Sequence, residues 1–253
     1  MGERRPRRFG ARRRGADASR TVAGGLSLVL YDLDGTLVDA FEDIAAALNH
    51  GLREAGLDEQ PIERVRAWVG DGILRLVERA AGPGNRNRAR EIVPAVRAYY
   101  NAHATRTARL YPGVKATLRR LRVSGLRQAI LTNKPHDVAL TSCDRLGLTP
   151  LVDAIQGETS GAPLKPDPRS ARRLIRRLKA TPAGTVMVGD GPADLALAKA
   201  AGIAMIGCAW GTTPRQRLLA AGCDVVIEAI EELPGALERL RDRTPPPRSR
   251  PLR

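Results

Sequence analysis

The sequence has few cysteines, few lysines and no long apolar run. Its three cysteines, Cys143, Cys208 and Cys223, are an odd number without the close spacing of a metal site, which argues against a disulfide framework. We expect them to be small buried hydrophobic residues. The longest apolar run is far too short to cross a bilayer. The sequence therefore predicts a cytoplasmic protein that neither spans nor binds a membrane.

Positive charge is concentrated at the two ends of the chain. The formal net charge is +15, of which residues 1–25 carry +6 and residues 239–253 carry +5, so that +4 is left between them. Both end segments are rich in arginine and poor in apolar side chains, a composition typical of disordered tails. We do not expect nucleic acid as a partner. A basic nucleic-acid-binding protein is the alternative from a different functional class, and salt-dependent binding that is lost with the tails would favour it.

Alternating strand and helix signals predict the architecture. We expect strands at residues 26–31, 128–131, 153–156, 185–188, 203–208 and 225–227, and helices that include 114–123 and 170–179. Residues 41–55, 62–81 and 89–104 have a helical pattern with no strand between them. The fold class is therefore α/β: a Rossmann-like parallel sheet with helices on both faces, and an inserted all-helical cap domain. The predicted core is 26–37 and 108–238, the cap is 38–107, and 1–25 and 239–253 are basic tails.

Polar residues follow three of the predicted strands at the point where each strand ends. Asp32 and Asp34 follow the first strand, and the alternation of an extended chain directs both to the same side. Thr132 and Asn133 follow the second predicted strand, and Asp190 follows the fourth. Open parallel sheets bind ligands at this edge. The pattern predicts that these side chains share one site.

Each of these residues also has a simpler explanation. Asp34-Gly35 is a common turn dipeptide, and Thr36 is a good helix cap. Acids such as Asp190 and Asp194 are favoured at helix starts. Lys165 is one of only five lysines in the chain and lies in a proline-rich loop, where it is free to be a solvated charge. If all of these simpler explanations held, residues of this kind would have to occur by chance in four separate segments of one chain.

The chain resembles the haloacid dehalogenase superfamily, and most closely its phosphoglycolate phosphatase branch, over residues 26–233. The resemblance rests on four motifs in the family's order and spacing: Asp32-Leu33-Asp34-Gly35-Thr36, Thr132-Asn133, Lys165, and Gly189-Asp190 with Asp194. It implies a Mg²⁺-dependent phosphate monoester hydrolase that forms an aspartyl-phosphate, and the partner is then a small-molecule phosphate ester. A monomer or a homodimer is expected.

The resemblance also implies a role for each motif residue. Asp32 is the nucleophile, Asp34 the acid and base, and Lys165 a compact positive charge beside the phosphate. The expected phosphate-binding groups are Thr132, Asn133 and Lys165. Mg²⁺ prefers oxygen ligands, which Asp32, Asp34 through its backbone carbonyl, and Asp190 supply. Asp194, Gly35 and Thr36 are expected to support this site.

Substrate choice is expected to depend on the cap, because the core groups all address phosphate and metal. Gly70 and Gly72 flank a turn that brings backbone N–H groups near a ligand, and Arg79 is able to bind a carboxylate in a bidentate manner. With the resemblance, this favours hydrolysis of 2-phosphoglycolate to glycolate and phosphate. The Tyr99-Tyr100 pair is expected to pack in the core of the cap. A pyrophosphatase and a sugar-phosphate phosphatase or mutase of the same fold stay open as alternatives.

Overall fold

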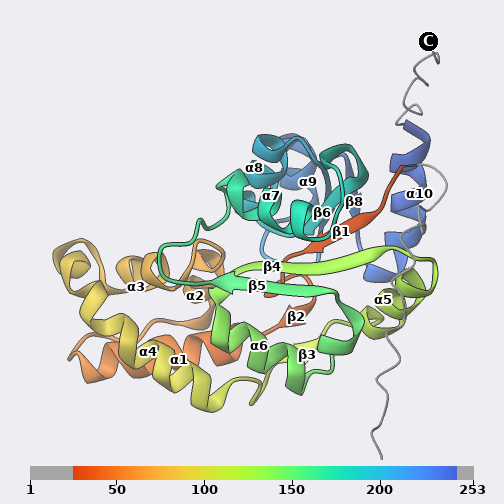
Figure 1. The fold of residues 1–253 in the computed structure, drawn as a ribbon. Coiled ribbons are helices and arrows are strands. Elements are labelled where there is room, and N and C mark those ends of the chain that lie inside the picture. Colours follow the sequence, from red (N-terminus) through yellow and green to blue (C-terminus); the bar gives the residue numbers. More distant parts are fainter. Residues whose placement is uncertain (1–24, 244–253) are drawn as a thin grey trace, which may run out of the picture.

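A parallel sheet with helices on both faces forms one part of the molecule, and a group of helices beside it forms the other (Figure 1). The computed structural model describes residues 25–243. Tails were predicted for residues 1–25 and 239–253, and most of each, residues 1–24 and 244–253, lies outside the described residues. Helix α10 continues to Arg243, so residues 239–243, which the sequence analysis assigned to the C-terminal tail, are helical. Their helix packs on the core through Leu233, Leu237 and Leu240, which are buried.

The core sheet has six parallel strands in the order β5-β4-β1-β6-β7-β8. All six predicted strands are present: β1 (Leu28–Tyr31), β4 (Arg127–Pro135), β5 (Ala154–Glu158), β6 (Thr185–Gly189), β7 (Ala204–Cys208) and β8 (Val225–Ile227). Strand β1 is central, and Tyr31 at its end lies opposite Ile130 of β4 and Val188 of β6. Because later parts of the chain add strands on both sides of β1, its carboxyl end opens into the crevice where such sheets bind ligands.

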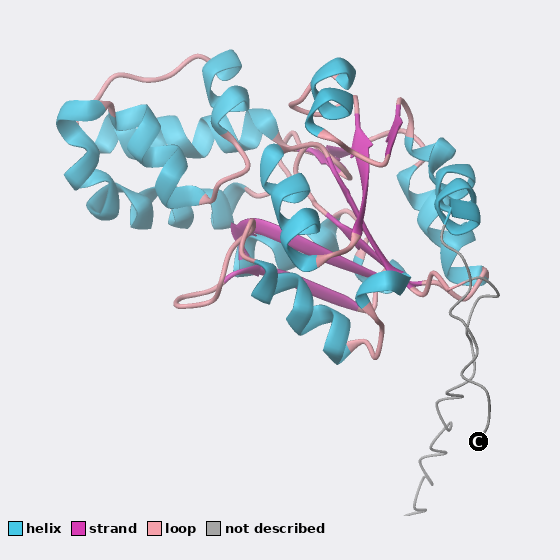
Figure 2. Cartoon of the chain, turned by 90° about the horizontal axis from the view of Figure 1, so that it is seen from above, coloured by secondary structure: helices cyan, strands magenta, loops and turns pink. Residues whose placement is uncertain are grey.

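The alternation of side chains along β1 divides the core into two layers. Val29 and Tyr31 pack with one set of helices, whereas Leu28 and Leu30 pack with another on the opposite face. The first set is α5 (Val114–Val123), α6 (His136–Arg145) and α10 (Leu233–Arg243), and the second is α7 (Pro168–Arg177), α8 (Pro192–Ala201) and α9 (Arg215–Ala221). Figure 2 shows the strands lying between helices in this way. Short 3₁₀ turns complete the connections: η2 (Thr149–Leu151), η3 (Pro182–Gly184) and η4 (Ile230–Glu232).

The helical cap lies between two short strands that pair with each other. Strands β2 (Val38–Asp39) and β3 (Arg109–Leu110) are antiparallel, so the chain leaves and re-enters the core at one place. The cap consists of α1 (Phe41–Glu54), α2 (Ile62–Trp68), α3 (Ile73–Ala81), η1 (Pro83–Arg88) and α4 (Ala89–His103). The prediction of a single helix over residues 62–81 is wrong. The chain forms two helices there, separated by residues 69–72, where Gly70 (φ 125°) and Gly72 (φ 89°) adopt a backbone conformation that favours glycine.

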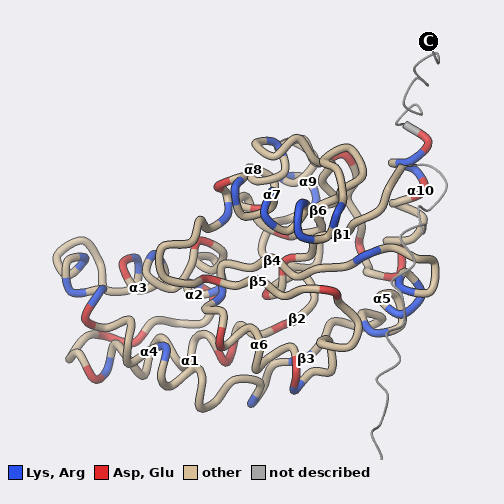
Figure 3. Tube along the Cα trace, in the orientation of Figure 1, with Lys and Arg blue, Asp and Glu red and all other residues tan. Residues whose placement is uncertain are grey.

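Charges of both signs occur in the cap and in the core (Figure 3). Helix α7 is strongly basic, with five arginines in its ten residues. Its buried side chains are Ser170, Ala171, Leu174 and Ile175, so the arginines lie on the opposite, outer side of the helix. Across residues 25–243, the helices are all too short or too polar to cross a membrane.

Candidate active site

Asp32 and Asp34 lie at the carboxyl end of the central strand. The Asp32 N–H donates to the Val188 carbonyl at 2.9 Å, which extends the pairing with β6 one residue beyond β1. The Asp32 side chain is largely buried, and its Oδ1 accepts from the Leu33 N–H at 2.7 Å. Asp32 and Asp34 both line one cavity beneath the cap. The carboxylate of Asp32 is therefore held in a fixed orientation at the floor of this cavity.

Lys165 supplies a buried positive charge next to Asp32. Its Nζ lies 2.8 Å from Asp32 Oδ1 and 2.7 Å from Asp194 Oδ1. Burial alone would lower the pKa of Lys165, but the charges of Asp194 and Asp32 outweigh it and hold this pKa above its usual value. Lys165 therefore stays protonated, and Asp194 positions it while also accepting from the Gly191 N–H at 3.1 Å.

Asp190 is a third acid at this edge, and hydrogen bonds orient both of its oxygens. Thr36 Oγ1 donates to Asp190 Oδ1 at 2.9 Å, and the Thr212 N–H and hydroxyl both donate to Oδ2 at 2.7 Å. Burial raises the pKa of Asp190, and the nearby charge of Asp32 raises it further. Such a group is stabilised as a carboxylate when a cation lies beside it.

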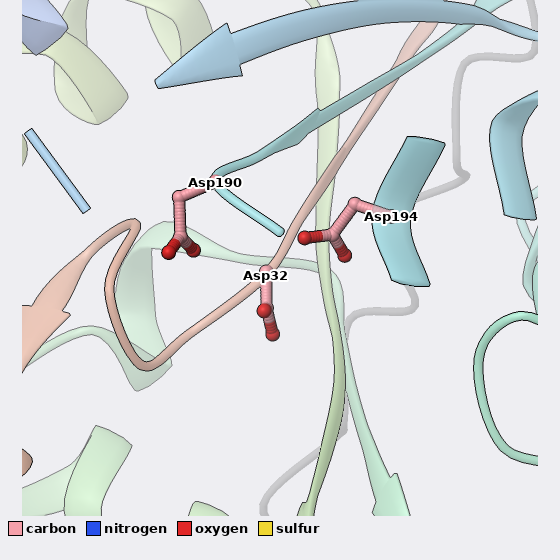
Figure 4. A group of neighbouring side chains, drawn as sticks. All are labelled: Asp32, Asp190 and Asp194. Atoms are coloured by element: carbon pink, nitrogen blue, oxygen red, sulfur yellow. The ribbon is translucent and has the colours of Figure 1, made fainter. Parts of the chain in front are cut away.

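Three carboxylates from three separate segments of the chain lie next to one another (Figure 4). One oxygen each of Asp32, Asp190 and Asp194 lies within 4.8 Å of the others. These are hard oxygen donors of the kind that Mg²⁺ prefers. Both oxygens of Asp194 are occupied, one by Lys165 Nζ and the other by the Gly191 N–H, whereas the Lys165 and Leu33 contacts of Asp32 are both made by its Oδ1. The donor set that fits a cation therefore consists of Asp32 and Asp190.

Two glycines allow the chain to pass close to Asp190. A Cβ at Gly35, where φ is 85°, would lie 2.5 Å from Asp190 Oδ2, and a Cβ at Gly211 would lie 2.3 Å from Asp190 Cβ. Both contacts are too short for any side chain to occupy. Gly35 therefore supports the site by leaving space for the Asp190 carboxylate, and Gly211, which the sequence analysis did not single out, does the same from the other side.

The end of β4 contributes Thr132 and Asn133. The sequence predicted that the strand stops at residue 131, but it continues to Pro135 with an irregular register after Leu131. Asn133 Nδ2 donates to the Lys165 carbonyl at 2.8 Å and to the Gly70 carbonyl at 2.9 Å, and its Oδ1 accepts from the Lys165 N–H at 2.8 Å. The Asn133 side chain thus fixes the Lys165 loop and joins it to the cap.

Comparison with known proteins identifies the family. A model of the haloacid dehalogenase-like hydrolases matches residues 29–208. The chain is 34% identical to a plasmid-encoded phosphoglycolate phosphatase of Cupriavidus necator, over 87% of this chain and 97% of the relative. It is 33% identical to a phosphoglycolate phosphatase of Pseudomonas putida, over 83% and 80% of the two chains. The chain belongs to the haloacid dehalogenase-like hydrolase family.

A solved structure agrees with this assignment. The crystal structure titled as a predicted phosphoglycolate phosphatase from Haemophilus somnus is 26% identical, with a TM-score of 0.77 over 84% of this chain and 98% of that one. The family resemblance and the α/β fold with an inserted helical cap are therefore confirmed. The chain is a hydrolase, and its four motifs are the residues gathered at the carboxyl edge of the sheet.

Lys134 is a residue of this hydrolase that sequence reasoning missed. Its Nζ lies 2.9 Å from Asp34 Oδ1 and 3.1 Å from Asp34 Oδ2, and it also donates to the Tyr100 hydroxyl. Its side chain is 2% exposed. Burial raises the pKa of Asp34, and the opposing effect of Lys134 does not cancel the rise. One signal was available in the sequence: Lys134 is one of five lysines and directly follows Asn133.

Tyr100 has a second role besides packing. It is buried in the cap, as expected, but it also lines the cavity with Asp34 and Lys134. Lys134 Nζ lies 4.4 Å from the centre of its ring. Tyr99 is different, because it stacks between His50 and His103 on the cap. Tyr100 therefore packs in the cap as expected and, in addition, forms part of the cavity wall.

The cap residues expected to choose the substrate lie in two places. Gly70 and Gly72 line the cavity, which has a volume of about 60 Å³. Apart from Tyr100, its remaining cap lining is apolar: Ile44, Val69, Ile73, Leu76 and Val96. Arg79 lines a second opening, whose wall also contains Asp32, Asp34, Asp190 and Thr212. It pairs there with Asp71 and donates to the Trp68 carbonyl at 2.8 Å.

An ion pair also joins the cap to the core at the surface. Arg97 of α4 donates to both oxygens of Asp137 in α6, at 3.1 Å and 2.8 Å, and Asn101 Nδ2 donates to Asp137 at 2.6 Å. The Asp137 side chain is 43% exposed. These bonds lie at the junction between α4 and α6 and hold the cap in place over the cavity.

Proposed function

We propose that this chain is a Mg²⁺-dependent phosphatase that hydrolyses 2-phosphoglycolate to glycolate and inorganic phosphate through an aspartyl-phosphate on Asp32. The observation that carries the proposal is the position of the Asp32 carboxylate. It lies against the buried ammonium of Lys165 and close to the acid Asp190. Lys165 supplies positive charge on one side of Asp32, and a cation held by Asp190 would supply it on the other, which is what a carboxylate needs before it can attack a phosphate dianion.

The donor set of the site fits Mg²⁺. Asp32 and Asp190 would bind it through carboxylate oxygens, and Asp34 would bind it through its backbone carbonyl. Bound there, Mg²⁺ supplies charge neutralisation between the substrate phosphate and Asp32. Asp194 has a different task, because its 2.7 Å contact keeps Lys165 in place. Thr36, Gly35 and Gly211 keep Asp190 in position.

Different residues of the chain carry out the separate chemical steps. Asp32 attacks phosphorus, and the P–O bond to the leaving group breaks. Asp34, whose pKa is raised by burial, protonates the leaving oxygen and then takes a proton from the water that hydrolyses the aspartyl-phosphate. Lys165, the Thr132 hydroxyl and the Asn133 backbone bind the oxygens that do not react. Each group acts at a separate atom of the substrate.

The substrate assignment rests on the relatives and on the size of the cavity. The two curated relatives described above are phosphoglycolate phosphatases. A cavity of about 60 Å³ has room for a handful of water-sized groups, which suits a two-carbon acid better than a hexose. Gly70 and Gly72 would present their backbone to such a ligand, whereas Arg79, which is paired with Asp71, would not contact it. A cytoplasmic location and a monomeric or dimeric state are also proposed, and three unpaired cysteines favour the first.

The test is phosphate release from four compounds: 2-phosphoglycolate, ethyl phosphate, pyrophosphate and glucose 6-phosphate. Each is assayed with Mg²⁺ and after removal of divalent ions with EDTA. We expect kcat/KM for 2-phosphoglycolate to exceed the other values by about tenfold or more, which corresponds to about 1.4 kcal/mol in the transition state. Activity should disappear with EDTA and return with Mg²⁺. Equal rates on 2-phosphoglycolate and glucose 6-phosphate would contradict the substrate, and full activity in EDTA would contradict the metal.

A further inference from the structure

The cavity beneath the cap has one cationic side chain in its wall. Among the described residues that line it, Lys134 is the only lysine or arginine. Lys165 lies below the floor, between Asp32 and Asp194. Arg79 lines a second opening, which reaches Asp32 and Asp34 from the side of Asp190, and it is paired there with Asp71. A second anionic group on a substrate in this cavity therefore has Lys134 as its cationic neighbour.

Because Lys134 donates to Tyr100, the hydroxyl proton of Tyr100 is left free to donate to a ligand. An ammonium group has three protons to donate and accepts none. Lys134 therefore donates to the Tyr100 oxygen, as it does to Asp34. Tyr100 is the acceptor in this contact, so its own hydroxyl proton is left to donate to another group. The lysine and the tyrosine together present a charged donor and a neutral donor to the same part of the cavity.

The distances connect this pair of donors to the leaving group. Asp34 must contact the ester oxygen if it is to protonate it, and Lys134 Nζ is 2.9 Å from Asp34 Oδ1. In 2-phosphoglycolate, one methylene separates the ester oxygen from the carboxyl carbon. A carboxylate attached in this way extends from Asp34 toward Lys134 and Tyr100. A neutral ethyl group extends to the same place and meets the two donors without accepting a hydrogen bond.

The rest of the cavity wall strengthens such a contact. Val69, Ile73 and Val96 line the cavity from the cap and carry no polar side chain. Charge interactions are stronger where apolar groups exclude water. Lys134 belongs to β4 in the core and Tyr100 belongs to α4 in the cap, so the two donors come together only when the cap lies over the sheet.

We propose that Lys134 and Tyr100 form the subsite that binds the carboxylate of the leaving group, and that they determine the preference of the enzyme for an acidic two-carbon phosphate ester. This inference rests on the proposed function, because it assigns the residues that select the proposed substrate. It replaces a cap arginine by a core lysine as the group that binds the carboxylate. Arg79 is paired with Asp71 and does not bind the carboxylate in this proposal.

The experiment compares kcat/KM for 2-phosphoglycolate with kcat/KM for ethyl phosphate in each variant. The ratio is independent of the folded fraction, because both substrates are measured on one protein sample. Tyr100→Phe removes the hydroxyl and keeps the ring, and Tyr99→Phe is the matched control on the same helix. Lys134→Met removes the charge and keeps the length of the side chain. Because Lys134 also contacts Asp34, the ratio rather than either rate is the informative quantity.

We expect Tyr100→Phe to lower the ratio by about tenfold and Lys134→Met to lower it by more, as loss of hydrogen bonds to a charged group predicts. Tyr99→Phe and Arg79→Met should keep the wild-type ratio. A high wild-type ratio that both Tyr100→Phe and Lys134→Met retain would overturn this inference and leave the substrate assignment intact. A wild-type ratio near one would overturn the assignment and the inference together. A loss of preference in Arg79→Met alone would move the carboxylate subsite to the second opening.

Discussion

Lys165 Nζ lies 2.7 Å from Asp194 Oδ1, and both side chains are 1% exposed. An ion pair buried so completely stabilises the fold only while both members are present, because the loss of one leaves an unpaired buried charge. The pair also places a permanent positive charge next to Asp32. We therefore expect stability and catalysis to depend on the same contact.

Lys165→Met should abolish turnover and lower the free energy of unfolding by about 3–5 kcal/mol, the range for breaking a buried pair from one side. Lys165→Met combined with Asp194→Asn should lose less stability than the sum of the two single variants, because the double variant no longer buries an unpaired Asp194. Urea unfolding of the four proteins measures this. Strict additivity of the two single losses would show that the pair does not contribute as a unit.

Asp34→Asn should affect substrates according to their leaving group. Turnover of 2-phosphoglycolate should nearly stop, because an amide cannot protonate the poor alkoxide leaving group. Release of nitrophenolate from p-nitrophenyl phosphate needs no proton donor, so the first step should survive. The second step still lacks its base. Stopped-flow absorbance should therefore record a burst close to one equivalent of nitrophenolate, followed by a slow steady state. Equal losses on both substrates with no burst would argue against Asp34 as the acid and base.

Gly211→Ala should weaken the metal site. The added methyl group would lie 2.3 Å from Asp190 Cβ, so the Asp190 side chain has to move. We expect the Mg²⁺ concentration for half-maximal activity to rise by about tenfold or more, as is typical when the support of a metal ligand is altered. Gly84→Ala is the control, since a Cβ there has no atom within 4 Å. An unchanged Mg²⁺ dependence in Gly211→Ala would mean that Asp190 is not a metal ligand.

The contact of Asp137 with Arg97 should make cap docking depend on pH. Burial alone would raise the pKa of Asp137, but hydrogen bonds from Arg97 and Asn101 outweigh it and lower this pKa. A lowered pKa in the folded state contributes stability above the unfolded pKa of about 3.9, and this stability is lost as pH falls through the folded pKa. Because the pair is well exposed, its contribution should be at most about 1 kcal/mol.

The corresponding measurement is thermal unfolding of wild type and Asp137→Asn from pH 7 to pH 3. The variant should be less stable at pH 7, and the difference should shrink toward pH 3. Asp144→Asn, an exposed acid on the same helix, should show no such trend. A difference between wild type and Asp137→Asn that grows as the pH falls would reverse the sign expected here.

Much of the fold could be predicted from the sequence because hydrophobic segments and strand ends are local signals. The six strands of the sheet follow from short apolar runs, and Asp32, Thr132 and Asp190 follow because parallel strands end at one edge. The interruption between α2 and α3 was missed, because the apolar period on both sides concealed the effect of Gly70 and Gly72.

The contacts between cap and core could not be predicted, because they depend on how two units separated in sequence are placed. Lys134 and Tyr100 are 34 residues apart, and nothing local to either indicates the other. The position of the Arg79 side chain also could not be predicted from the sequence. Its side chain was expected near the substrate, and it pairs with Asp71 at an opening that also contains Asp32, Asp34 and Asp190. The motif residues were visible in the sequence, whereas Lys134 and Tyr100, which we propose to contact the leaving group, were visible as a pair only in the structure.

The identity of the residue that carries the phosphoryl group tests the central claim most directly. The Asp34→Asn enzyme is mixed with p-nitrophenyl phosphate and Mg²⁺, quenched in acid during the slow phase, digested and analysed by mass spectrometry. The account predicts one phosphoryl group on the peptide that contains Asp32, and none when Asp32→Asn is added to the same variant. A phosphoryl group on another residue, or a full burst that leaves Asp32 unmodified, would contradict the account.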